Sequence, residues 1–256
     1  MRRIHALLVA ASTFIATQAV SAAEVHVMIS GGFTAAYKQL VPQFEKATGH
    51  TVVTAYGPSM GETPQAIPMR LSRGEPADVL IMVGYALGDL VSKGQVVADS
   101  RVDLADSPIG VAVKAGAPRP DLSSPETLKA ALLAAKTIAY SDSASGVYVS
   151  TEMFNRLGIA EQMKGKARKI PATPVGEIVA SGLAEIGFQQ ISELKPVAGI
   201  DIVGPLPPAL QQITVFSAGL SSKAPQPDAG GALIAFLSSV QAAPVMAATG
   251  LEPKVK

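Results

Sequence analysis

The sequence predicts an α/β fold. Short apolar runs of strand length alternate with longer segments whose apolar residues recur at helical spacing. Such alternation is typical of parallel strands joined by crossover helices. Breaks near 106–108 and 204–208 divide the 256 residues and suggest two lobes. The chain contains no Trp and only 5% aromatic residues, so we expect a core built from Ala, Val, Leu and Ile.

In the first half of the chain, the clearest helix is expected from residue 34. Tyr37, Leu40 and Phe44 fall on one helical face, and Gly49 ends the segment. The other expected elements are strands at 25–29, 51–55 and 79–83, a helix at 63–74 bent at Pro68, and a helix at 85–93.

A second series of elements follows residue 108. Ser124, Pro125 and Glu126 predict the start of a helix, since Ser caps a helix, Pro suits its first position and an acid suits its first turn. The other expected elements are strands at 109–113, 137–140, 186–190 and 213–220, and helices at 147–157, 176–184 and 228–240, the last capped by Asp228.

Residues 1–23 have the pattern of a secretory signal peptide. Arg2 and Arg3 precede an apolar stretch over 6–16, and small residues follow up to Ala23. The stretch is too short to span a bilayer. No Cys follows the expected cut, so we expect no lipid anchor and a protein that diffuses freely in the periplasm.

Charge and composition exclude several classes of partner. The 21 basic and 20 acidic residues nearly balance, which gives no electrostatic footprint for nucleic acid or for an anionic membrane. With only 3 His and no Cys, the chain is poorly supplied for metal or acid–base chemistry. We expect no cofactor, no metal and a monomer.

Four expected strand-to-helix junctions share small and hydroxyl residues. At such junctions, backbone N–H groups and Ser hydroxyls lie at the carboxyl ends of the strands, where ligands of open α/β sheets bind. An anion suits this edge, because helix N-termini offer unpaired N–H donors. The four junctions are Ser30-Gly31-Gly32, Ser59-Met60-Gly61, Ser143-Ala144-Ser145-Gly146 and Pro174-Val175-Gly176.

Catalytic motifs are nearly absent from the sequence. No G-x-S-x-G, Walker A or H-E-x-x-H pattern occurs. The run from Ser192 to Lys195 fits S-x-x-K, but its companion motifs are missing, and we interpret it as a solvated helix end. Ser143 has no evident activating group. We therefore expect no enzymatic activity, with a serine-dependent enzyme as a weaker alternative.

Several stretches resemble the periplasmic molybdate-binding proteins of ABC transporters. They are residues 74–79 (Gly-Glu-Pro-Ala-Asp-Val), residues 122–135 and residues 145–148 (Ser-Gly-Val-Tyr), in the family's order over essentially the whole mature chain. The resemblance identifies the chain as a divergent member. It implies a two-lobed class II periplasmic binding protein fold with a two-strand hinge, which captures a small anion and delivers it to a membrane permease.

The resemblance also implies an arrangement of domains. Residues 24–106 together with 209–256 would form lobe 1, and residues 107–208 would form lobe 2. An envelope sensor or adaptor that uses the same cleft is the alternative to transport.

Two positions depart from the family's ligand site. Ser59 and the backbone N–H of Val175 match it, but Gly32 replaces a ligand-binding Ser, and Gln190 replaces a Tyr. A roomier pocket would suit a small organic carboxylate, which Arg70 could clamp. The ligand is thus either a molybdate-type oxyanion or a small carboxylate. The expected ligand-binding residues are Ser30, Gly31, Gly32, Ser59, Met60, Arg70, Ser145, Gly146, Val175 and Gln190.

Overall fold

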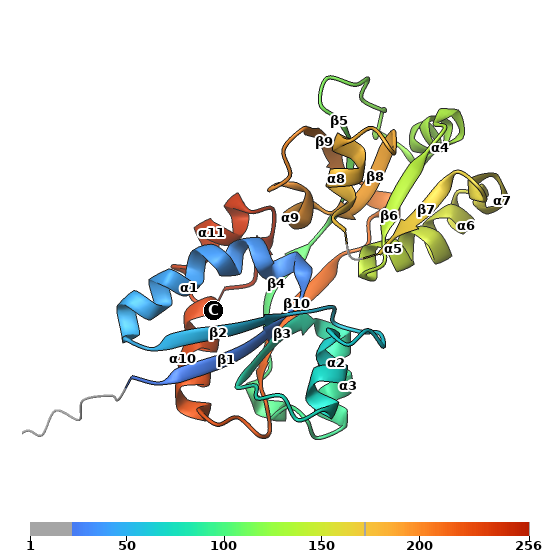
Figure 1. Cartoon of the computed structure of the whole chain (residues 1–256). Coiled ribbons are helices and arrows are strands. Elements are labelled where there is room, and N and C mark those ends of the chain that lie inside the picture. Colours follow the sequence, from blue (N-terminus) through green and yellow to red (C-terminus); the bar gives the residue numbers. More distant parts are fainter. Residues whose placement is uncertain (1–21, 172, 256) are drawn as a thin grey trace, which may run out of the picture.

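The computed structural model describes residues 22–171 and 173–255. The predicted signal peptide lies almost entirely outside the described residues. Two β-sheets, each flanked by helices, form two lobes (Figure 1). We call the part around the six-stranded sheet lobe 1 and the part around the five-stranded sheet lobe 2. The fold is therefore the predicted two-lobed class II periplasmic binding protein fold.

Lobe 1 is organised around β3, whose residues are all buried. Such a continuous apolar run suits a strand covered on both faces. The sheet order is β11-β4-β10-β3-β1-β2, in which β1 pairs in parallel with β2 and β3. The elements are β1 Glu24–Ile29, η1 Gly31–Phe33, α1 Thr34–Thr48, β2 Thr51–Tyr56, α2 Ile67–Ser72, β3 Val79–Val83, α3 Gly84–Ser92, η2 Ala98–Ser100, β4 Val102–Ser107, β10 Thr214–Leu220, α10 Pro227–Leu237, α11 Ala243–Ala248 and β11 Glu252–Pro253.

Lobe 2 has the sheet order β7-β6-β8-β5-β9, with β6 parallel to both β7 and β8. Its buried apolar residues form clusters separate from the lobe 1 core, so each lobe has a core of its own. The elements are β5 Ile109–Lys114, α4 Pro125–Ala134, β6 Ile138–Ser141, α5 Ala144–Tyr148, the π-helical turn η3 Val149–Met153, α6 Phe154–Arg156, α7 Ala160–Met163, β7 Ala167–Ile170, α8 Val175–Ala180, β8 Ile186–Gln190, α9 Ile191–Leu194, β9 Ile200–Pro205 and η4 Pro208–Leu210.

The lobes are joined where two antiparallel strands of lobe 1 end. β4 ends at Ser107, and only Pro108 separates it from β5. The chain returns from β9 through residues 206–213 into β10, and Thr214 pairs with Ser107 in the ladder. This pair of crossings is the two-strand hinge.

Three local expectations were wrong. The helix expected at 63–74 begins at Ile67, and Pro68 lies in its first turn, where the missing N–H costs nothing, instead of bending it. α10 is preceded by Gln226, so Asp228 lies inside its first turn rather than at the cap. The helix expected from residue 147 begins at Ala144.

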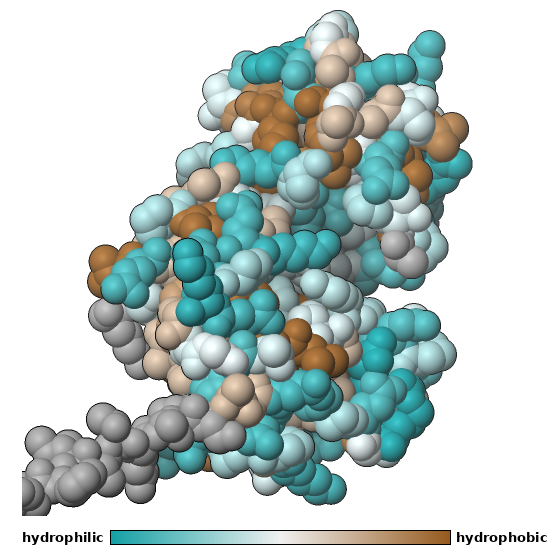
Figure 2. Space-filling view, turned by 60° about the vertical axis from the view of Figure 1, so that its left-hand side comes forward, coloured by the Kyte–Doolittle hydropathy of each residue, from teal (hydrophilic) through white to brown (hydrophobic). Residues whose placement is uncertain are grey.

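No helix within residues 22–171 and 173–255 is long and apolar enough to cross a bilayer. On the face shown in Figure 2, hydrophobic residues occur in small patches among hydrophilic ones.

Candidate functional site

The carboxyl ends of the strands from both lobes border one pocket, whose cavity volume is about 70 Å³. The predicted residues that line it are Ser30, Gly31, Gly32, Ser59, Met60 and Gln190. No Lys, Arg or His occurs among the described residues that line this pocket.

On the lobe 1 side, two serines form a hydrogen-bonded pair. Ser59 Oγ donates to Ser30 Oγ over 2.7 Å and accepts from the Val83 N–H over 3.0 Å. Both serines are only 5% exposed. Since the Ser59 proton is used within the pair, the Ser30 hydroxyl keeps its own proton for a ligand. Ser30 follows β1 and Ser59 follows β2, as the junction argument predicted, and Val83 is the last residue of β3.

Two glycines of the first junction allow close approaches. A Cβ at Gly32 would collide with the ring of Phe216, and one at Gly31 would collide with Oε1 of Glu193. Phe216 and Glu193 both line the pocket. The loop between β1 and α1 therefore places backbone, apolar ring and carboxyl group next to one another.

On the lobe 2 side, a hydroxyl cluster supports the pocket wall. Ser141 Oγ lies 2.7 Å from Ser143 Oγ and 2.9 Å from Ser145 Oγ. Ser143 lines the pocket, whereas Ser145 is fully buried behind it. Gly146 lies against the Ser141 carbonyl, where a Cβ would not fit. Ser145 and Gly146 thus shape the wall and do not themselves line the pocket.

Gln190 connects the pocket with the hinge. In the orientation that satisfies its neighbours, its amide nitrogen donates to the carbonyls of Ser107 (2.9 Å) and Pro108 (3.1 Å). Its amide oxygen accepts from the Thr214 hydroxyl over 2.9 Å. All these partners lie where the chain crosses between the lobes, so Gln190 contacts both the hinge and the pocket.

Glu193 is the most unusual group in the pocket. It lies in α9, directly after β8, and is partly buried. Burial raises the pKa of the Glu193 carboxyl from its ordinary value of 4.5 to about 7. The nearby charge of Asp142 also raises this pKa, whereas a hydrogen bond from Gln189 lowers it. At neutral pH, both protonation states of Glu193 are therefore populated.

The segment that contains Glu193 was not among the predicted site residues, although Glu193 lines the pocket. The interpretation of 192–195 as a solvated helix end is wrong, since Ser192 is 1% exposed and Leu194 is fully buried. One available signal was position: the segment follows the carboxyl end of a predicted strand, like the four junctions that were selected.

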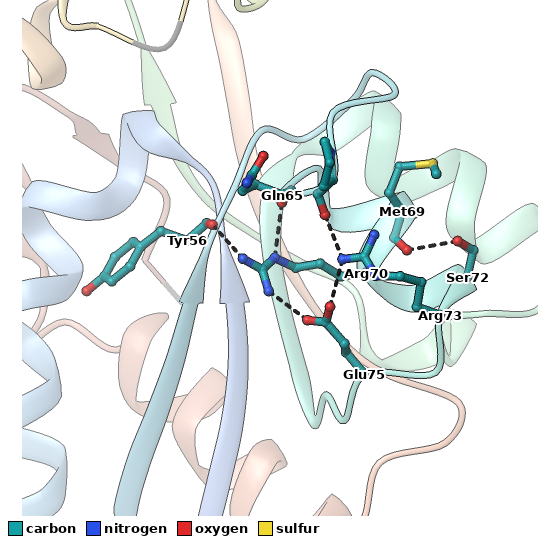
Figure 3. A network of polar contacts seen from close by, with 8 residues as sticks. Tyr56, Gln65, Met69, Arg70, Ser72, Arg73 and Glu75 are labelled. Carbon is teal, nitrogen blue, oxygen red and sulfur yellow. Dashed lines mark hydrogen bonds and ion pairs between the residues drawn. The ribbon is translucent and has the colours of Figure 1, made fainter.

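Two predicted ligand-binding groups make protein contacts instead. Arg70 Nη1 lies 2.6 Å from Glu75 Oε2, and Arg70 Nε donates to the Gln65 carbonyl over 3.1 Å (Figure 3). Its guanidinium thus stabilises the turn around α2 and does not line the pocket. The Val175 N–H donates to Gln189 Oε1 over 2.8 Å, inside lobe 2.

A second hollow of the cleft continues from the pocket at Ala144, which borders both. Arg101 of lobe 1 and Glu152 of lobe 2 line this hollow. Arg101 Nη2 lies 3.2 Å from Asp103 Oδ1, and its side chain is 36% exposed. Arg101 is therefore a partly exposed cation that lines the cleft.

The chain is similar to known proteins over nearly its whole length. The family model for bacterial extracellular solute-binding proteins matches residues 25–252. The chain is 50% identical to "Aconitate isomerase" of Pseudomonas sp over 98% of this chain and 95% of that protein. It is 28% identical to "Molybdate-binding protein ModA" of Azotobacter vinelandii over 95% of this chain and 96% of that protein.

Solved structures share the fold at low sequence identity. The periplasmic molybdate-binding protein of Azotobacter vinelandii matches with a TM-score of 0.69 and 23% identity, over 89% of this chain and 98% of that one. The sulfate-binding protein SubI of Mycobacterium tuberculosis matches with a TM-score of 0.69 and 18% identity, over 90% and 87%.

The relative named as an isomerase corrects one expectation. The absence of known catalytic motifs led us to expect a protein without enzymatic activity. A relative named as an enzyme, with half of its residues identical over nearly the whole chain, contradicts that expectation. The patterns that are absent from the sequence describe nucleophiles, phosphate loops and metal sites, and none of them describes a single carboxyl group such as the one in this pocket.

Proposed function

The chain belongs to the family of bacterial extracellular solute-binding proteins, and we propose that it binds aconitate, a small tricarboxylate, between its lobes and isomerises it. The 50% identity to a protein named for this activity supports the substrate and the reaction. The fold supplies a pocket into which both lobes contribute, as capture of a small solute requires.

One observation about the pocket carries this proposal. The Glu193 carboxyl, whose pKa is raised to about 7 by burial, lines the pocket together with the hydroxyl residues Ser30 and Ser59. A receptor for a tetrahedral oxyanion needs only fixed donors and has no use for a group that exchanges protons. An isomerase that moves a double bond needs fixed donors and also a group that exchanges protons, because its substrate must lose one proton and gain another.

The lining of the cleft suits a carbon skeleton with several carboxylates. Met60, Val83 and Phe216 give the pocket an apolar side against which a hydrocarbon chain can pack. Ser30 and the backbone of the first junction can donate to one carboxylate. Arg101, in the adjoining hollow, is the cation that a further carboxylate would reach.

Delivery of the bound solute to a membrane permease is a second candidate function. Two lobes with separate cores, joined by two strands, form an arrangement that can open and close around a ligand. A permease would recognise the closed form. Transport and isomerisation use the same cleft, and both would place the protein in the periplasm.

A binding panel tests the ligand class. Thermal unfolding is measured with cis-aconitate, trans-aconitate, the saturated propane-1,2,3-tricarboxylate, molybdate and sulfate. A ligand present at 100 times its Kd adds about 2.7 kcal/mol to the free energy of unfolding. We expect the tricarboxylates to raise the midpoint, and molybdate and sulfate to leave it unchanged. Stabilisation by molybdate alone would contradict the proposal.

A further inference from the structure

We infer that Glu193 is the catalytic acid–base residue of this pocket and that Gln189 is its positioning residue. The inference rests on the proposed isomerisation and names the group that moves the proton.

The position of Glu193 places its carboxyl group where substrate would lie. α9 begins directly after β8, so the side chain stands at the carboxyl edge of the lobe 2 sheet. It reaches across to lobe 1, where its Oε1 lies over Gly31 and occupies the space that a Cβ would need. Glu193 thus faces both the Ser30 junction and the cavity.

A relay of hydrogen bonds orients this carboxyl group. The Val175 N–H, at the start of α8, donates to Gln189 Oε1 over 2.8 Å. This fixes the amide oxygen of Gln189, so that its NH₂ group is the part that donates to Glu193. Gln189 is only 5% exposed, which holds the relay in place. Gln189 therefore supports the ionised form of Glu193 without exchanging a proton itself.

Other candidates for the proton carrier are poorer. The described residues of the pocket include no His, Lys, Arg or Cys. Asp142 is the other acid in the lining, but it is exposed and belongs to the loop after β6. Lys195, the nearest cation along the chain, is exposed and donates to the Ala248 carbonyl. Ser143 shares its hydroxyl with Ser141, and an aliphatic hydroxyl is too weak a base to take a proton from carbon.

The pKa of Glu193 suits a residue that takes up a proton and returns it at neutral pH. A general base works best when its pKa lies near the working pH, since it must accept a proton and then return it. Burial and the charge of Asp142 raise the pKa of Glu193 to about 7. The carboxylate is then basic enough to take a proton from carbon, and its acid form is strong enough to return it.

The reaction conserves atoms and electrons without a co-reactant. The Glu193 carboxylate takes a proton from the CH₂ carbon next to the double bond of aconitate. The C–H electron pair forms a new C=C bond to the central carbon, and the pair of the old C=C bond moves to the other outer carbon. That carbon then takes the proton back from Glu193. Substrate and product have the same formula, and the bound conformation sets the geometry of the new double bond.

Neutral donors can stabilise the charge that develops in between. When the proton leaves, negative charge spreads onto the oxygens of a substrate carboxylate. The Ser30 hydroxyl faces such an oxygen, and Ser59, held by the Val83 N–H, fixes its orientation. Donors fixed in advance by the fold are the kind that lower a barrier of this type.

The test compares the parent with Glu193→Gln, Glu193→Asp and, as a matched control, Glu126→Gln. Glu126 is an exposed glutamate of α4, outside the pocket. We expect Glu193→Gln to lower kcat at least a hundredfold while the Kd for propane-1,2,3-tricarboxylate changes less than about fivefold. Glu193→Asp should restore part of the activity, and Glu126→Gln should behave like the parent.

Two further readouts separate catalysis from structure. Aconitate deuterated at its CH₂ group should react several-fold more slowly with the parent. The parent's pH profile should show a limb near pH 7, and Gln189→Leu should move this limb to higher pH because the hydrogen bond that lowers the pKa is lost.

Each outcome separates the two proposals. Parent-like activity of Glu193→Gln would overturn the inference and leave the isomerase proposal standing. A parent that binds aconitate and never converts it would overturn both.

Discussion

Replacing Glu193 by Gln should make the stability of the protein less dependent on pH. The folded state raises the pKa of this carboxyl group from 4.5 to about 7. Between these values the folded chain binds the proton more tightly than the unfolded chain does. The free energy of unfolding therefore falls as the pH rises through this window. The loss is complete once the pH exceeds about 7, when the carboxyl is ionised in both states.

The magnitude follows from the two pKa values. One pKa unit corresponds to about 1.4 kcal/mol. The raised pKa of Glu193 therefore lowers the free energy of unfolding by about 3 kcal/mol in total as the pH rises through the whole window. Between pH 5 and pH 8 the expected loss is about 2 to 3 kcal/mol, and partial exposure of the side chain makes this an upper bound. Gln is nearly isosteric with the protonated acid and does not titrate, so the variant should lack this loss.

Urea unfolding at pH 5 and pH 8 measures the effect. Other groups titrate alike in both proteins, so the stability of Glu193→Gln minus that of the parent isolates Glu193. This difference should be larger at pH 8 than at pH 5. The exposed control Glu126→Gln should give the same difference from the parent at both pH values. An equal difference for Glu193→Gln at pH 5 and pH 8 would refute the assignment of the raised pKa to Glu193.

Three other substitutions test the geometry of the cleft. Ser59→Ala should weaken tricarboxylate binding by about 1–3 kcal/mol in calorimetry, because the Val83 N–H loses its acceptor and Ser30 its donor; an unchanged Kd would place the site elsewhere. Arg101→Ala should raise the KM for aconitate while Arg70→Ala leaves it unchanged, since Arg101 lines the cleft and Arg70 is paired with Glu75; the opposite result would restore Arg70 to the site. Asp142→Asn should move the limb of the pH profile to lower pH, because a like charge near Glu193 is removed; a limb that stays in place would mean that Asp142 does not act on Glu193.

The sequence was a good guide to features set by local patterns. The apolar runs predicted most strands, and the placement of Ser and Gly after β1 and β2 located Ser30 and Ser59 at one edge. This worked because parallel strands bring their carboxyl ends together whatever the details of packing. The lobe boundaries at 24–106 with 209–256 and at 107–208, and the signal peptide, stay predictions.

The parts of the site that escaped prediction depend on contacts distant in sequence. Glu193 lies in a helix of four residues, too short for a periodic pattern, and its carboxyl group lies against Gly31 of the other lobe, far away in sequence. Arg70 is the opposite case, a predicted site residue that does not line the pocket. A lone arginine in a sequence looks equally suited to a ligand or to an ion pair, and only the fold shows that Glu75 already occupies its guanidinium.

The most direct test of the account is a time course of aconitate in the presence of the purified protein. Samples that start from pure cis-aconitate and from pure trans-aconitate are followed by proton magnetic resonance at pH 7, with the parent and with Glu193→Gln. The account predicts that both samples converge on one mixture, at a rate proportional to the concentration of the parent, and that the variant slows this at least a hundredfold. Isomers that stay unchanged while they saturate the parent's pocket would contradict it.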